Sequence, residues 1–186
     1  AMHSSRKRLR GFTMPELLKA MAVGAISLAV AVPSFNATIN NNRRTTAVND
    51  LFATMQTARS ESITRNAQIT VCPSASGENC DGTNWNEGWI YFADLDRSRA
   101  VDGPETVLGV IDERPRLTIS SAEFSDFLAY RPNGRIMVGT VAENTGSLIV
   151  CDTRGAEYAR VLSIELTGQP QVSDRMPNGA LPVCPA

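Results

Sequence analysis

Histidine is almost absent from this chain of 186 residues, and its one histidine, His3, lies ahead of the first long apolar run. Histidine is the usual general base of enzymes at neutral pH and the commonest metal ligand. The nucleophile motif G-x-S-x-G and the glycine-rich loops that cradle phosphates are also missing. We therefore expect neither an enzyme nor a bound cofactor.

Positive charge is also scarce outside the first residues. The formal net charge is −1, but residues 1–11 hold four basic and no acidic side chains, which leaves 14 basic against 19 acidic residues in the remainder. An acidic chain has no general attraction to phosphate backbones. A nucleic-acid site would have to be a local basic patch.

The chain has four cysteines and no C-x-x-C motif, which argues against a zinc site. All four follow an apolar run that basic residues precede, so they should lie outside the cytoplasm, in the bacterial periplasm, where disulfides persist. Four cysteines allow three pairings. We favour Cys72–Cys80, closing a short polar loop, and Cys151–Cys184, tying the last segment to a strand.

The order of residue types near the amino terminus is distinctive. A basic run ends at Gly11, an apolar run follows over residues 12–35, and Glu16 stands near its start. Residues 12–35 have the length of a transmembrane helix, which needs about 17–25 residues. A carboxylate at membrane depth costs about 2.5 kcal/mol or more, so Glu16 should serve a partner.

An ordinary secretory signal is the alternative. It would have an apolar core of roughly 7–15 residues with a small-residue cleavage site after it. Here the core is longer and carries Glu16 and Lys19 near its start. We therefore favour a different kind of signal.

The order of these residues resembles the class III signal of type IV prepilins and pseudopilins. In that family a prepilin peptidase cuts after the glycine, here Gly11, and methylates the new amino terminus, here Phe12. The carboxylate at the position of Glu16 helps to neutralise the terminal amine of a neighbouring subunit. Met14-Pro15 replaces the usual Leu-Ile, but proline is tolerated in a first helical turn.

Residues 36–66 predict an amphipathic helix. Its apolar stripe recurs at three- and four-residue steps and should pack on a sheet: Val48, Leu51, Phe52, Met55, Ala58 and Ser62. Short β-like runs follow at residues 68–72, 89–93, 106–110, 117–120, 127–131, 135–138, 147–151 and 160–166. Asn133-Gly134 predicts a hairpin turn between two of them.

Several strings in this region resemble the FimT/FimU/GspH group of minor pilins and pseudopilins. They are residues 58–66, 72–74, 88–92, 130–135 and 148–152. The resemblance implies an α+β type IV pilin-like fold: a leader at 1–11, the transmembrane half of a long helix at 12–35, its amphipathic periplasmic half at 36–66, and a β-rich domain at 67–186. The chain should pass from the inner membrane, with its amino terminus cytoplasmic, into a filament of other pilins.

The resemblance implies a minor subunit that primes a type IV pilus at its tip, with a GspH-like pseudopilin of type II secretion as the alternative. A second alternative is DNA binding. FimT relatives that take up DNA carry Gly-Arg-x-Arg where this chain reads Gly168-Gln169-Pro170-Gln171. Three arginines remain as possible DNA contacts, and we disfavour the site: Arg154, Arg160 and Arg175.

The segment from Asp94 through Asp96 to Asp102 and Glu105 has oxygen donors at alternating positions, as calcium loops do. We do not expect a metal there. The segment departs from an EF-hand in its glycine and its closing glutamate, and two arginines, Arg97 and Arg99, would oppose a dication. A solvated turn between strands is the expectation.

Overall fold

The computed structural model describes residues 12–137 and 145–185, so Gly11 and the rest of the expected leader lie outside the described residues. The chain divides into two compact units, Ala1–Asn40 and Asn41–Ala186. Each unit is described by itself below.

A long helix, α1, runs from Met14 to Arg65. Pro15 lies in its first turn, as the sequence predicts, because the N–H that proline lacks has no partner there. At the other end Asn66 adopts a left-handed φ of 50°. The Asn66 N–H donates to the Ile63 carbonyl at 3.3 Å and the Ala67 N–H to the Ser62 carbonyl at 3.2 Å. This pair of bonds satisfies the last carbonyls and ends the helix.

The segment expected to span a membrane, residues 12–35, is helical from Met14 onward. Over the part of the chain that the structure describes, however, no helical stretch combines the length and the hydropathy that a membrane crossing needs.

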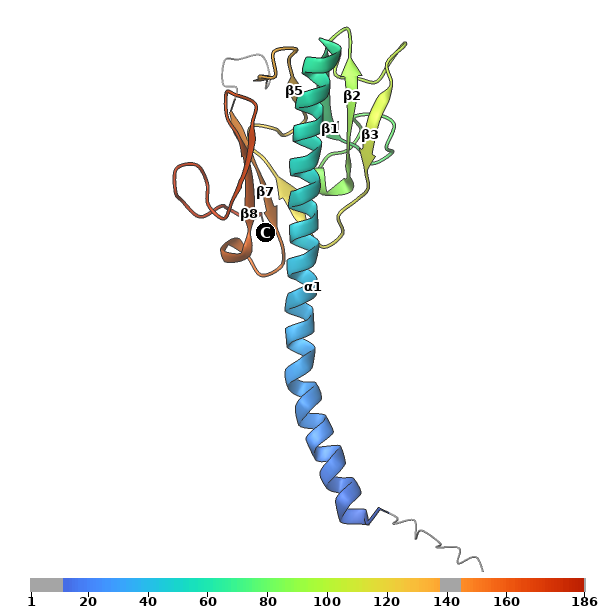
Figure 1. The fold of residues 1–186 in the computed structure, drawn as a ribbon, viewed down its shortest axis with the longest axis vertical. Coiled ribbons are helices and arrows are strands. Elements are labelled where there is room, and N and C mark those ends of the chain that lie inside the picture. The colour runs from blue at the N-terminus through green and yellow to red at the C-terminus, as the bar shows by residue number, and fades with distance from the viewer. Residues whose placement is uncertain (1–11, 138–144, 186) are drawn as a thin grey trace, which may run out of the picture. The chain divides into compact units, whose positions relative to one another are not determined.

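Among the described residues, nine strands follow the helix. They form two antiparallel sheets (Figure 1). The first sheet has the order β3-β2-β1-β5-β6 and the second the order β4-β7-β8-β9. Their bounds are β1 Gln68–Pro73, β2 Trp89–Asp94, β3 Val107–Ile111, β4 Thr118–Ser120, β5 Leu128–Tyr130, β6 Ile136–Met137, β7 Gly146–Cys151, β8 Arg160–Ile164 and β9 Pro170–Ser173. Two short 3-10 helices, η1 Trp85–Glu87 and η2 Ala156–Tyr158, lie in the connections.

The described residues contain the eight predicted strands, with shifts at their ends, and one that was missed. Residue 138, the last of the run predicted at 135–138, lies outside the described residues. Strand β9 begins at a proline and alternates weakly, so its sequence carries little strand signal. Strand β8 stops at Ile164 rather than at residue 166, because the chain turns at Gly168, whose φ is 74°. A Cβ at Gly168 would lie 2.0 Å from the Gly134 carbonyl oxygen, so this close approach requires glycine.

The predicted apolar stripe forms the centre of the domain. Five of its six members are buried and Phe52 is only partly buried; the buried ones are Val48, Leu51, Met55, Ala58 and Ser62. Ala47, which the prediction did not include, is buried beside them. Figure 1 shows this part of α1 against both sheets, with β1–β3 on one side of it and β7 and β8 on the other. Burying side chains such as Leu51 and Met55 contributes about 1.5–3 kcal/mol each.

Polar contacts fix the helix along its length in this unit. The Trp89 indole N–H donates to the Thr54 hydroxyl at 3.0 Å, and the Arg59 side chain donates to the Gly134 carbonyl at 3.1 Å. Asp50 forms an ion pair with Arg114 at 2.7 Å. These contacts set the register of α1 on the first sheet, which apolar packing alone leaves less defined.

Arg44 makes the corresponding contact with the second sheet. Its side chain is buried, with the residue 6% exposed, and the guanidinium donates to the Tyr158 carbonyl. It lies 3.8 Å from the Asp152 carboxylate, which also forms a two-oxygen pair with Arg154. Burial and then the charges of Arg160 and Arg154 lower the pKa of Arg44, and the hydrogen bond from Arg154 is the chief cause that lowers the pKa of Asp152. Asp152 therefore compensates a positive charge that the fold removes from water.

Two disulfides each join a strand of the domain to a segment outside the sheets. Cys72–Cys80 joins residues 8 apart around the loop after β1, and Cys151–Cys184 joins residues 33 apart, from the end of β7 to the last segment. These are the pairs that the sequence analysis favours.

The longer disulfide should contribute more stability. Cys184→Ser should lower the free energy of unfolding of the oxidised protein by about 2–5 kcal/mol, and by roughly 1 kcal/mol more than Cys80→Ser, because it closes a longer loop of the unfolded chain. Both replaced cysteines are only half-buried, so neither change opens a core cavity. Denaturant unfolding measures the difference. An unaltered unfolding midpoint for Cys184→Ser would contradict this pairing.

Asp152 should make the domain acid-sensitive. Because folding lowers its pKa, its contribution is present above the unfolded value of about 4 and is lost as the pH falls through the lower folded value. Asp152→Asn should lower the melting temperature at pH 7, since Arg44 is left without its countercharge. It should also flatten the loss of stability as the pH falls below the unfolded pKa of about 4. The exposed Asp126→Asn is the control and should keep the acid-induced loss of the parent protein. Equal acid profiles for parent and Asp152→Asn would refute this role.

Candidate functional site

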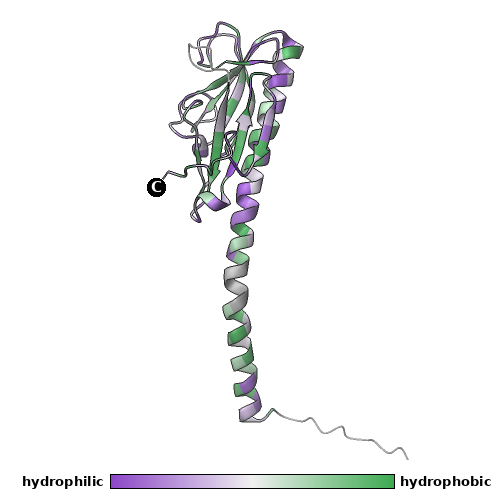
Figure 2. Cartoon of the chain, turned by 90° about the vertical axis from the view of Figure 1, so that its left-hand side faces the viewer, coloured by the Kyte–Doolittle hydropathy of each residue, from purple (hydrophilic) through white to green (hydrophobic). Residues whose placement is uncertain are grey.

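The amino-terminal half of α1 has an apolar surface that the described chain leaves uncovered. Every side chain described over residues 12–29 and 35–39 is exposed, including Phe12 at 83% and Ile26 at 68%. Figure 2 shows hydrophobic residues along this part of the helix, with hydrophilic ones at its start. A helix that is apolar around its circumference is stable only when other apolar groups surround it.

Glu16 lies in the first turn of this helix, near the exposed Phe12. The structure gives it no ion pair with any described cation, Lys19 included. A carboxylate there is favoured by the positive end of the helix dipole. Whatever the surrounding apolar residues pack against must also accommodate this charge.

The three arginines suggested for DNA contact are only partly brought together. The electrostatic influence of Arg154 and Arg160 on Arg44 places both near that residue, at one end of the second sheet. Arg175 follows β9, whose Ser173 pairs with Val161, so it leaves the sheet beside the start of β8. Its guanidinium donates to the Gly179 carbonyl at 3.2 Å, within the turn that follows β9.

Arg154 is committed to contacts within the domain. Its guanidinium binds both oxygens of Asp152, donates to the Asn41 side chain at 2.8 Å and lies 4.3 Å from the centre of the Tyr158 ring. These contacts occupy the fork that would bind a phosphate. DNA binding through this residue stays an untested prediction.

Arg44 is the residue that the sequence reasoning missed. It precedes the apolar stripe by four residues and shares its spacing through Val48, Leu51 and Met55, so it falls on the buried face. A charged residue at a stripe position signals a buried countercharge. Asp152 meets that requirement.

The chain resembles known proteins in family and in fold. Residues 47–168 match the family described as Type II transport protein GspH. No curated protein sequence matches the chain. Two crystal structures of the type IV minor pilin FimU of Pseudomonas aeruginosa, in different space groups, are similar to it in fold.

The first FimU structure has a TM-score of 0.57 at 23% identity and covers 77% of this chain and 95% of FimU. The second has a TM-score of 0.52 at 20% identity and covers 74% and 96%. These likenesses confirm the predicted α+β type IV pilin-like fold, a long amino-terminal helix packed on antiparallel sheets. The family match spans most of the chain and supplies the classification. The chain belongs to the GspH family of minor pilins and pseudopilins, structural rather than enzymatic subunits whose family assembles with other pilins, in the inner membrane and then in a filament.

Proposed function

We propose that this chain is a minor pilin that primes a type IV pilus, entering the filament through the first half of α1. The observation that carries this proposal is the uncovered apolar surface of residues 12–29 and 35–39. A bundle of equivalent helices from other subunits would cover that surface on all sides. The described β domain, although much longer, exposes fewer large apolar side chains than this segment does.

Two features suit this segment to such a bundle: small side chains, and a hydroxyl that is already hydrogen-bonded within the helix. Ala20 and Gly24 are one helical turn apart, and a Cβ at Gly24 would meet nothing within 4 Å. Small residues at this spacing let neighbouring helices approach closely. The Ser27 hydroxyl donates to the Val23 carbonyl at 2.9 Å, so burial would leave no unpaired donor there.

In this proposal the prepilin peptidase cleaves after Gly11 and methylates Phe12. Before assembly, residues 12–35 lie in the inner membrane with the amino terminus in the cytoplasm and the β domain in the periplasm. Glu16 then pairs with the terminal ammonium of a neighbouring subunit inside the bundle. A charge pair in apolar surroundings is costly to leave half-made, so it selects one register between neighbours.

The alternative is a GspH-type pseudopilin of type II secretion. The description of the matching family favours it, whereas the two similar structures are of a type IV minor pilin. Both functions use the same assembly surface. Deleting the gene separates them: loss of pili with intact secretion supports the pilus subunit, and loss of secretion with intact pili supports the pseudopilin.

Replacing Glu16 should block assembly without blocking membrane insertion. Glu16→Gln keeps the shape of the side chain but leaves the neighbouring ammonium unpaired in the bundle, at a cost of about 3–5 kcal/mol. Incorporation into sheared filaments should fall by on the order of a hundredfold. The measurement is the amount of the subunit in the filament and membrane fractions.

Lys19→Gln is the matched control, because it removes a charge from the same segment. It should assemble like the parent protein. Normal incorporation of Glu16→Gln would contradict the pairing of Glu16 with the terminal ammonium of a neighbouring subunit. It would not contradict the packing of α1 in a helix bundle.

A further inference from the structure

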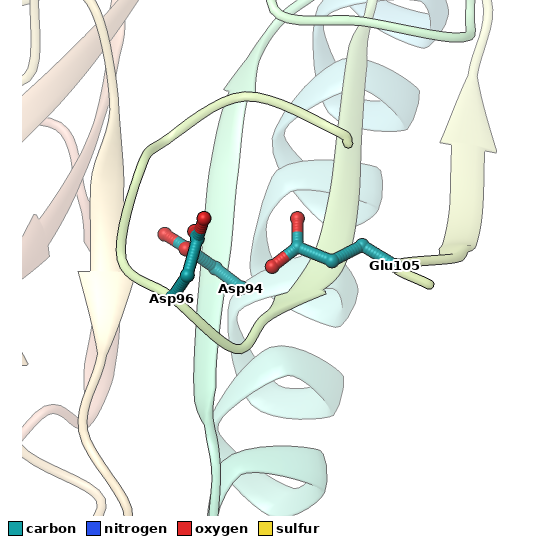
Figure 3. A group of neighbouring side chains, drawn as sticks. All are labelled: Asp94, Asp96 and Glu105. Atoms are coloured by element: carbon teal, nitrogen blue, oxygen red, sulfur yellow. The ribbon is translucent and has the colours of Figure 1, made fainter. Parts of the chain in front are cut away.

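The loop between β2 and β3 places three carboxylates together. Asp94 is the last residue of β2, Asp96 follows in the loop, and Glu105 lies just before β3. One oxygen from each lies within 4.8 Å of the other two. Figure 3 shows Asp94 and Asp96 side by side with the Glu105 side chain extending toward them.

Two of these carboxylates carry buried oxygens that have no hydrogen-bond partner. Asp94 is 0% exposed; its Oδ2 accepts from the Gln68 amide at 2.9 Å and the Thr70 hydroxyl at 2.6 Å, but its Oδ1 is unpartnered. In Glu105, Oε1 accepts from the Leu95 N–H, and the buried Oε2 has no partner. Burying a carboxylate oxygen without a hydrogen-bond donor or a cation costs free energy. Each of these two oxygens therefore indicates a partner that does not come from the protein itself.

Basic side chains do not meet this need. Arg99 stacks on Phe127, with its guanidinium carbon 4.3 Å from the ring centre. Arg97 lines a pocket with Arg131 and Pro132. Neither arginine forms an ion pair with the three carboxylates in the described part of the chain. Both arginines lie against other residues, so neither supplies the donor that the buried carboxylate oxygens lack.

The spacing of the loop also corrects the sequence analysis. Counted from Asp94 as the first position, Asp96 is the third, Ser98 the fifth, Asp102 the ninth and Glu105 the twelfth. These are the ligand positions of an EF-hand loop, whose twelfth residue is a glutamate. The expectation that the closing glutamate is out of place was wrong.

The central glycine of an EF-hand is replaced by Arg99, but its backbone conformation is present. Arg99 has a φ of 66°, in the left-handed region that glycine usually occupies. The Ser98 hydroxyl lies 3.2 Å from the Ala100 carbonyl and 3.5 Å from the Asp102 carboxylate, so three further oxygens gather in the same loop. The Ser98 N–H donates to Asp96 at 2.8 Å.

We propose that residues 94–105 bind a calcium ion through the carboxylates of Asp94, Asp96 and Glu105. Further oxygens would come from the same loop, in which Ser98, Ala100 and Asp102 occupy the fifth, seventh and ninth positions. Calcium takes six to eight oxygens at about 2.3–2.6 Å, so oxygens on opposite sides of one ion lie about 5 Å apart, in accord with the separation here. Magnesium needs a tighter octahedron at about 2.0–2.1 Å. The ion neutralises the buried charge and fixes the loop to the ends of β2 and β3.

This proposal does not depend on the proposed function. Its test uses the full oxidised chain in detergent, stripped with a chelator and titrated with CaCl₂ alone or MgCl₂ alone. Calorimetry should detect calcium binding, and the melting temperature should rise as calcium is added up to about millimolar levels. Magnesium at the same concentration should give a clearly smaller rise.

Two variants locate the site. Glu105→Gln removes the closing carboxylate, and the exposed Asp96→Asn removes a ligand without disturbing the core; each should weaken calcium binding on the order of tenfold or more. Glu165→Gln, at an exposed glutamate directly after β8, is the matched control and should keep the calcium response. The absence of binding heat and of any thermal shift with calcium would overturn the proposal and assign the two orphan oxygens to water. An equal response to magnesium, or full calcium affinity in Asp96→Asn, would overturn it as well.

Discussion

The apolar stripe on the second half of α1 is the contact on which the rest of the domain depends. Neither sheet could bury its inner face alone, because each is small and antiparallel. Leu51 and Met55 lie in one core cluster with residues of both sheets, among them Val71 and Leu148. The helix thus joins two sheets that share no strand. The polar contacts of Arg44, Asp50 and Arg59 then define where along the helix each sheet sits.

The same helix has no such partner in its first half. There the apolar residues are exposed, and the one acidic residue, Glu16, has no described counterion. Membership in a family of filament subunits accounts for this contrast between the two halves of α1. The second half of α1 completes its own domain, and we propose that the first half packs against the corresponding helices of other subunits.

Much of this arrangement could be predicted from the sequence, because it follows from local periodicity. Three- and four-residue steps gave the buried stripe, alternation and turn residues gave eight strands, and Asn133-Gly134 forms the hairpin turn between β5 and β6. Strand β9 could not be predicted, since pairing with β8 rather than its own pattern makes it a strand. The burial of Arg44 depends on Asp152, which is far away in the sequence. The unpaired oxygens of Asp94 and Glu105 become apparent only when β2 and β3 bring the two residues together. Non-local contacts of this kind leave little trace in a local pattern.

Site-specific photo-cross-linking from the first half of α1 tests the central claim most directly. A photoreactive residue at Met21, in cells that assemble the filament, should yield cross-links to the amino-terminal helices of other pilins, whereas one at exposed Leu166 in the β domain should not. Cross-links from Met21 to other pilin helices are the predicted result. A filament that contains this subunit yet gives no such cross-link from Met21 would contradict the account.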